Sequence, residues 1–120
     1  MNTVRPDILQ PAHDIIQWSH TLLKTAPLDS SQREDMQAVH NAARRFSAYA
    51  QSQIEIIRYG QDSVDLQRIR HCLRNHLNVI IGFTYLWIRI LPDNLLLHMQ
   101  LIRRIHTTGT DLMTQIEAIR

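Results

Sequence analysis

The chain contains little glycine, proline, cysteine or lysine. Three glycines and four prolines among 120 residues are too few for a turn-rich all-β domain, because such domains depend on these residues at their many turns. Pro27 and Pro92 both stand where helical patterns stop. The composition therefore favours an all-α chain, and its length is that of a single domain, since ordinary domains have about 100 to 200 residues.

A lone cysteine and the absence of a long hydrophobic run limit the cellular compartments that we expect for this protein. Cys72 has no second cysteine for an intrachain disulfide or a cysteine metal site, and it fits a reducing compartment. The most apolar run, 79–91, contains Arg89 and is shorter than the ~20 residues that a membrane span needs. The first residues lack an apolar core followed by a cleavage site. We expect a cytoplasmic protein with no secretory signal and no membrane span.

Charges of the two signs nearly cancel, with 13 Lys+Arg against 11 Asp+Glu. No block of like charge dominates, so no nucleic-acid partner is predicted. Lys24 is the single lysine, and the arginine bias suits pairing with carboxylates or phosphates. His13 and His20 stand seven residues apart. His71 and His76 stand five apart, and neither spacing is the i, i+4 spacing of two ligands on one helical face. We predict no metal site and no cofactor.

Apolar residues recur at three- and four-residue spacing in four segments, which predicts four helices. The expected helices span about 7–24, 30–59, 62–91 and 93–119. For the second helix, a cap at Ser30 or Ser31 with Glu34 resembles a capping box, and Gly60 supplies a C-terminal stop. Short links make neighbouring helices antiparallel. The predicted fold is an antiparallel up-down four-helix bundle in one domain, 1–120.

The two halves of the chain, hairpin 1 over about 7–59 and hairpin 2 over about 62–119, can be aligned with each other. Shifts of 65 residues in the first helix and 66 in the second bring together the pairs Ile8–Leu73, Trp18–Phe83, Ser19–Thr84, Val39–Ile105 and Phe46–Leu112. Four-helix packing alone also produces such matches, so tandem duplication of a helical hairpin is one of two hypotheses. In this alignment Pro6 stands at the position of His71.

Residues 71–83 read His-Cys-Leu-Arg-Asn-His-Leu-Asn-Val-Ile-Ile-Gly-Phe and combine an apolar stripe with a polar one. On a helical wheel the predicted core face consists of Leu66, Ile69, Leu73, Leu77, Ile80 and Thr84. His71, Asn75, Asn78 and Gly82 lie together on the opposite side. A phosphoacceptor imidazole must be exposed, with a free ring nitrogen for attack on phosphorus. His71 meets this requirement, and the alternative is an ordinary surface histidine.

This string resembles the dimerisation and histidine-phosphoacceptor domain of two-component sensor histidine kinases. In that family the histidine is followed by an acid, Leu-Arg, a small polar residue, Pro, Leu, Asn, an aliphatic pair, Gly and an aromatic. The resemblance covers about 66–112, and it implies that His71 is the phosphoacceptor and that Asn75 positions the water for phosphatase activity. The chain departs from the pattern at Cys72, where the family has Glu or Asp, and at His76, where it has proline.

The resemblance also implies the partners: a response-regulator receiver domain or a histidine kinase. The residues predicted to bind the partner are Arg68, Arg70, Arg74, Asn78, Gly82 and Phe83. The arginines suit the acidic pocket of a receiver domain or a phosphoryl group. Sensor kinases carry an ATP-binding domain after the hairpin, and this sequence ends at Arg120. We expect at most a histidine phosphotransferase and not an autonomous kinase.

Three hypotheses concern the function. Retention of exposed His71, of Asn75 and of the arginines favours a signalling protein that docks receiver domains and relays phosphate. Loss of the acid and the proline favours a non-catalytic adaptor or inhibitor that binds a histidine kinase or response regulator without being phosphorylated. The third hypothesis is a structural helical dimer outside signalling. The segment from Val79 to Leu91 is apolar nearly all round, which suggests a homodimer or a protein partner.

Overall fold

Four long helices and two short helical segments make up residues 7–59 and 64–119, the part of the chain that a computed structural model describes. They are α1 (Leu9–Thr25), α2 (Ser30–Ser52), α3 (Ile54–Tyr59), α4 (Val64–Ile90), the 3-10 helix η1 (Asp93–His98) and α5 (Met99–Glu117). There is no strand in this part of the chain. The prediction of an all-α fold is confirmed.

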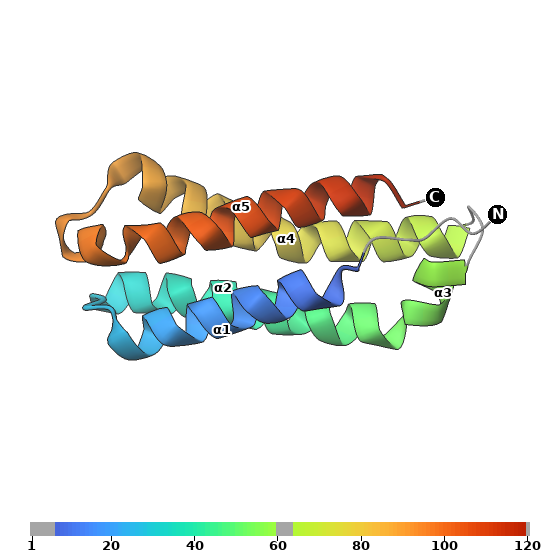
Figure 1. Cartoon of the computed structure of the whole chain (residues 1–120), viewed down its shortest axis with the longest axis horizontal. Helices are drawn as coiled ribbons and strands as arrows, with labels where there is room; N and C mark the ends of the chain where they lie inside the picture. Colours follow the sequence, from blue (N-terminus) through green and yellow to red (C-terminus); the bar gives the residue numbers. More distant parts are fainter. Residues whose placement is uncertain (1–6, 60–63, 120) are drawn as a thin grey trace.

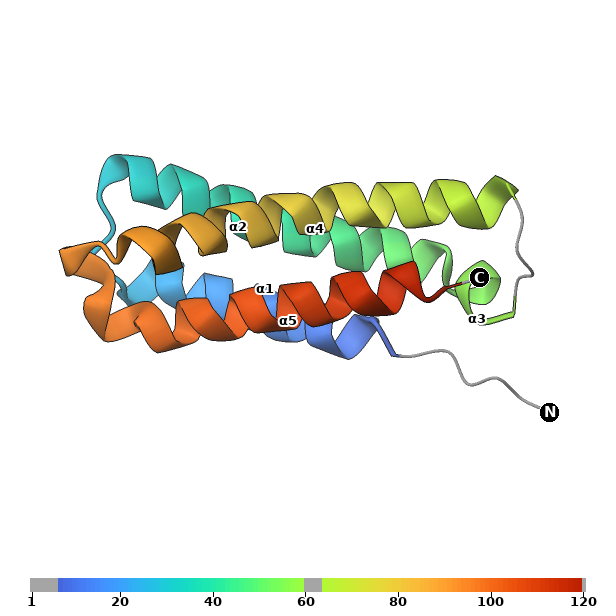
Figure 2. The same cartoon turned by 90° about the horizontal axis from the view of Figure 1, so that it is seen from above.

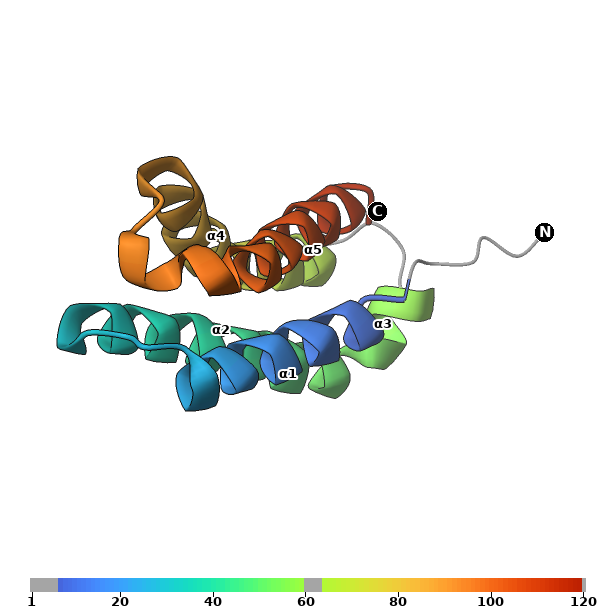
Figure 3. The same ribbon diagram turned by 60° about the vertical axis from the view of Figure 1, so that its left-hand side comes forward.

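The long helices alternate in direction along a body of 50 × 21 × 19 Å (Figure 1). The α1–α2 hairpin forms one layer and the α4–α5 hairpin the other (Figure 3). Between the layers, α4 packs against α2 and α5 packs against α1 (Figure 2). The structure is therefore the antiparallel bundle that the sequence predicts, and one chain supplies all four long helices of its core.

The core face of α4 lies where the helical periodicity places it. Its apolar members are at most 3% exposed, and Thr84 is also buried. Burial of a Leu or Ile side chain contributes about 1.5 to 3 kcal/mol, so these stripes supply most of the stability of the bundle. In α5 Gly109 lies close to α4, because a Cβ there would be 3.3 Å from Cγ1 of Ile81, which is a tight contact. None of the helices within the described ranges combines the length and apolarity needed to cross a membrane.

The start of α2 is capped by a residue other than the predicted serine. Asp29 accepts a hydrogen bond from the Gln32 backbone N–H at 2.7 Å, and the Gln32 side-chain oxygen accepts one from the Asp29 N–H at 3.1 Å. The expected cap at Ser30 or Ser31 is wrong, because both serines already belong to the helix. Such a reciprocal cap is worth about 1 kcal/mol.

The end of α2 also differs from the prediction, which carried this helix to Tyr59 without interruption. The helix ends at Ser52, and Gln53 adopts φ −109° and ψ 13° before α3 begins. This break turns the chain toward the start of α4 (Figure 1), and Ile57 of α3 is buried. Periodicity persists across a break of one residue, so the pattern could not reveal it. The predicted stop at Gly60, the predicted helix start near residue 62 and the alignment of Pro6 fall outside the described residues.

The loops of the two hairpins meet at one end of the bundle. The Asn94 side chain of η1 donates to the Pro27 carbonyl oxygen at 3.0 Å. Its amide oxygen accepts a hydrogen bond from the Gln32 side chain at 3.3 Å. These contacts join η1 to the α1–α2 connection, so the two layers are held together at this end by polar groups as well as by the core.

Candidate functional site

The polar stripe of α4 lies on the surface of the bundle. His71, Asn75, Asn78 and Gly82 are all exposed, as the helical wheel predicts. A Cβ at Gly82 would meet no atom within 4 Å, so this face of the helix is open to a partner. The His71 imidazole forms no hydrogen bond with any side chain or carbonyl of the described residues. Its ring nitrogens are therefore accessible for reaction or for binding.

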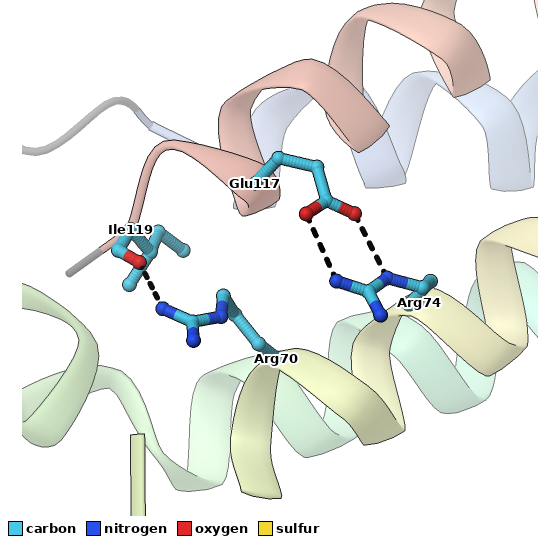
Figure 4. Close-up of polar contacts among 4 residues, drawn as sticks. All are labelled: Arg70, Arg74, Glu117 and Ile119. Atoms are coloured by element: carbon cyan, nitrogen blue, oxygen red, sulfur yellow. Dashed lines mark hydrogen bonds and ion pairs between the residues drawn. The ribbon is translucent and has the colours of Figure 1, made fainter. Parts of the chain in front are cut away.

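Two of the arginines beside this stripe are engaged within the chain. Arg74 forms a two-point ion pair with Glu117, with N–O distances of 2.8 and 2.9 Å (Figure 4). Arg70 donates a hydrogen bond to the carbonyl oxygen of Ile119. Both contacts hold the C-terminal end of α5 against α4. The partner-binding role predicted for these two arginines therefore competes with a structural one.

The third arginine remains at the surface. Arg68 lies 3.3 Å from the Asp65 carboxylate one turn earlier, and the two side chains are 70% and 64% exposed. An exposed pair of this kind contributes about 0 to 1 kcal/mol. Little is therefore lost when Arg68 exchanges Asp65 for an acidic group of a partner.

Cys72 is half-buried and lies beside His76 and Tyr49. The resemblance leads us to expect an acid at this position. Its sulfur lies 3.9 Å from Nε2 of His76. Burial, followed by the neighbouring Cys72, raises the pKa of Tyr49 on α2. Burial, followed by the positive charge of Arg45, lowers the pKa of His76. A half-buried thiol in this setting is no substitute for a carboxylate that accepts a proton beside His71.

The last turns of α4 and the following 3-10 helix expose an apolar surface. Phe83 is half-buried and stacks on Trp87 with a ring-centroid distance of 6.1 Å, and Trp87 is only 6% exposed. Phe83 therefore packs against the core as well as lining the surface. Beyond it lie exposed side chains that we call the apolar corner: Tyr85, Leu86, Ile90, Leu91, Leu96 and Leu97. The most exposed, Leu97, is 95% accessible.

Sequence reasoning missed a part-buried polar contact that occurs once in each hairpin. The Ser19 hydroxyl lies 2.8 Å from Nδ1 of His40, between α1 and α2. The Thr84 hydroxyl lies 3.0 Å from Nδ1 of His106, between α4 and α5. Both hydroxyls also donate to the carbonyl four residues earlier, at 2.8 and 2.7 Å. The shift of 65 residues places Ser19 on Thr84, and the shift of 66 places His40 on His106. The matching hydroxyl and histidine positions could therefore have been found from the sequence.

The described residues contain no group of three or more His, Cys, Asp or Glu side chains that could hold a metal ion. In comparisons with known proteins, the chain matches no family model, no curated protein and no solved structure. The candidate surfaces are thus an exposed imidazole on an open face of α4, an apolar corner formed by the end of α4 and by η1, and a second set of histidines between α1 and α2.

Proposed function

We propose that the chain is a cytoplasmic two-component signalling protein that docks receiver domains of response regulators along the outer face of α4 and relays phosphate through His71. The observation that carries this proposal is the exposure of His71 at the head of a polar stripe that stays exposed as far as Gly82. The resemblance of residues 66–112 to the phosphoacceptor helices of sensor kinases supports a phosphoacceptor role for this exposed histidine.

The proposed reaction is transfer of a phosphoryl group from a receiver aspartate. A neutral ring nitrogen of His71 attacks phosphorus, the bond from phosphorus to the aspartyl oxygen breaks, and the aspartate leaves as a carboxylate. The imidazole then carries the phosphoryl group, and its other ring proton can be lost to water. Asn75 lies one turn further along the same exposed face, where its amide can position a water molecule that hydrolyses the phosphohistidine.

The docking surface in this proposal has a polar and an apolar part. The stripe from His71 to Gly82 continues, one turn further along α4, to Tyr85 and Leu86 of the apolar corner. Exposed apolar patches of this kind mark protein interfaces. Arg68, whose only ion pair in the described residues is with exposed Asp65, supplies a positive charge for the acidic pocket of a receiver domain.

The direct test is phosphorylation of the purified chain. Receiver domains from the same genome, labelled with acetyl phosphate, are incubated with the chain, and acid-labile phosphate on histidine is measured. We expect label on wild type and none on His71→Ala. His13→Ala is the matched control, because His13 is another exposed helical histidine. Equal labelling of wild type and His71→Ala would contradict the relay.

A second candidate function, a non-catalytic adaptor or inhibitor, is favoured by the engagement of Arg70 and Arg74 and by the half-buried Cys72. It predicts a complex with a receiver domain or histidine kinase but no phosphate on His71. Binding that survives His71→Ala and is lost on Leu86→Asp, with no label transferred, would support this function over the relay.

Self-association through the apolar corner is a further part of the proposal, since large exposed leucines favour a homodimer or a protein partner. The molar mass of wild type and of Leu97→Asp, measured by light scattering, distinguishes a homodimer from a monomer that awaits another protein. A dimer that Leu97→Asp dissociates would assign the corner to a second copy. A dimer that binds no signalling partner at all would favour the hypothesis of a structural protein outside signalling.

A further inference from the structure

A hollow of about 470 Å³ lies on the surface between α1 and α2. Its lining residues are Ile16, Gln17, His20, Thr21, His40 and Arg44, and we call it the α1–α2 hollow. Small-molecule sites commonly have volumes of about 300 to 1,000 Å³. The hollow lies on hairpin 1, whereas His71 lies on α4, so a ligand site in the hollow does not depend on phosphate transfer through His71.

His40 is oriented by its contact with Ser19. The Ser19 oxygen lies 2.8 Å from the Ile15 carbonyl and 2.8 Å from Nδ1 of His40. A serine hydroxyl has one proton, and we assign it to the carbonyl, which has no proton of its own to share. Nδ1 of neutral His40 then carries a hydrogen and donates it to Ser19. Nε2 is then the ring nitrogen with the lone pair.

The titratable groups beside His40 in the hollow, His20 and Arg44, are cationic or can become so. The His20 ring lies 6.0 Å from the His40 ring, centroid to centroid, and the Arg44 guanidinium is close enough to influence its titration. No carboxylate lines the hollow. Within the described residues Arg44 forms no ion pair, unlike Arg68 and Arg74. Positive charge is thus gathered around one imidazole without an internal anion to balance it.

The corresponding region of hairpin 2 provides an internal comparison. There His106 is held by Thr84 as His40 is by Ser19, and Tyr85 stands at 6.3 Å where His20 stands in hairpin 1. The alignment replaces Arg44 by Thr110. The hydroxyl–imidazole contact therefore needs neither the second histidine nor the arginine. Those cationic groups are therefore available for another interaction in hairpin 1, and their charge suits recognition of an anion.

We infer that the α1–α2 hollow binds a phosphate group, held by the guanidinium of Arg44 and the imidazoles of His20 and His40. Arginine presents its N–H groups as a fork that matches two phosphate oxygens. The Thr21 hydroxyl already donates to the Gln17 carbonyl at 3.0 Å. The donors for the remaining phosphate oxygens are therefore the imidazole N–H of His20 and, once this ring is protonated, the Nε2–H of His40. A carboxylate has only two oxygens and one charge, so it cannot use this set of donors fully.

Binding should take up a proton. Burial, then the charges of Arg44 and His20, lower the pKa of His40, so this ring is mostly neutral near pH 7. Neutral His40 offers a lone pair at Nε2, whereas protonated His40 offers an N–H donor. A phosphate in the hollow offsets the repulsion from Arg44 and raises the pKa of His40. Affinity for phosphate therefore increases as pH falls through the titration of this imidazole.

The test monitors the histidine Cε1–Hε1 signals by NMR while inorganic phosphate, methyl phosphate, acetate or Zn²⁺ is added. We expect phosphate to shift His20 and His40 in a saturable way and to leave His106 unchanged. Substituting Arg44→Gln should weaken binding roughly tenfold, which corresponds to about 1.4 kcal/mol. Arg103→Gln, another exposed arginine outside the hollow, is the matched control and should leave binding unchanged.

The two phosphate probes also distinguish two natural ligands. If the hollow binds a phosphate ester, methyl phosphate should bind more tightly than inorganic phosphate. If it binds free phosphate, inorganic phosphate should bind more tightly. Equal shifts of His40 and His106 would overturn the inference, as would phosphate binding that is insensitive to Arg44→Gln. Tighter binding of acetate than of phosphate would also overturn it. A saturable response to Zn²⁺ with none to phosphate would assign the two histidines to a metal instead. His71→Ala should bind phosphate normally, which separates this result from the relay.

Discussion

The hydroxyl of Thr84 on α4 lies 3.0 Å from Nδ1 of His106 on α5. Thr84 is fully buried and also donates to the Ile80 carbonyl at 2.7 Å. The side chain therefore joins two helices while satisfying its own donor within one of them. In hairpin 1 the same arrangement joins Ser19 to His40 at 2.8 Å. Each hairpin thus has a polar contact of the same kind in a largely apolar interface.

Thr84→Val should destabilise the bundle. Valine keeps the shape of threonine but leaves Nδ1 of His106 without its partner, which costs about 1 to 3 kcal/mol. The free energy of unfolding from urea titration measures this loss. Thr114→Val is the matched control, since its hydroxyl also bonds a carbonyl four residues earlier but lies on the surface. A loss no larger than that of the control would contradict a stabilising role for the contact.

The ion pair between Arg74 and Glu117 should contribute more than that between Arg68 and Asp65. The first pair is 38% and 50% exposed and makes two parallel contacts, whereas the second is 70% and 64% exposed. Double-mutant cycles with alanine should give a coupling of about 0.5 to 1 kcal/mol for the first pair, and less for the second. Equal coupling energies for the two pairs would show that the two-point geometry of Arg74 contributes nothing. A coupling energy for Arg74 that high salt leaves unchanged would show that it is not electrostatic.

Gly82→Ala and Gly109→Ala should have different effects. Alanine at position 82 meets no atom within 4 Å, so it should stabilise the exposed helix by about 0.5 to 1 kcal/mol. At position 109 the new methyl would lie 3.3 Å from Ile81 and 3.4 Å from Ile80, which offsets that gain. Thermal unfolding of the two variants measures the difference. A larger gain at 109 than at 82 would mean that α4 and α5 separate readily.

The stability of the fold should fall as pH is lowered from about 7.5 to 5.5. The pKa values of His40 and His76 are lowered, mainly by burial, from an unfolded value of about 6.5. The unfolded chain therefore binds more protons in this range, so acid favours unfolding. Urea midpoints in buffers without phosphate measure the slope. His76→Gln should flatten it and His13→Gln, at an exposed position, should not.

The sequence contained enough information for the helices and for the buried face of α4, because the spacing of apolar residues defines which side of a helix leaves water. It also placed His71 and Gly82 on the exposed side. Contacts between helices were not accessible in this way. Arg74 meets Glu117, which is 43 residues away, and periodicity does not specify which polar neighbours face each other. The docking surface and the duplication of the hairpins remain predictions.

The core of this bundle is closed by helices of one polypeptide, which has a consequence for stoichiometry. When a bundle forms from two identical hairpins of two chains, every surface occurs twice in that bundle. Any substitution then appears in both copies. Here each surface occurs once per bundle. Hairpin 1 can thus carry a cationic hollow while hairpin 2 carries an apolar corner, and a partner at either surface would bind with one copy per bundle.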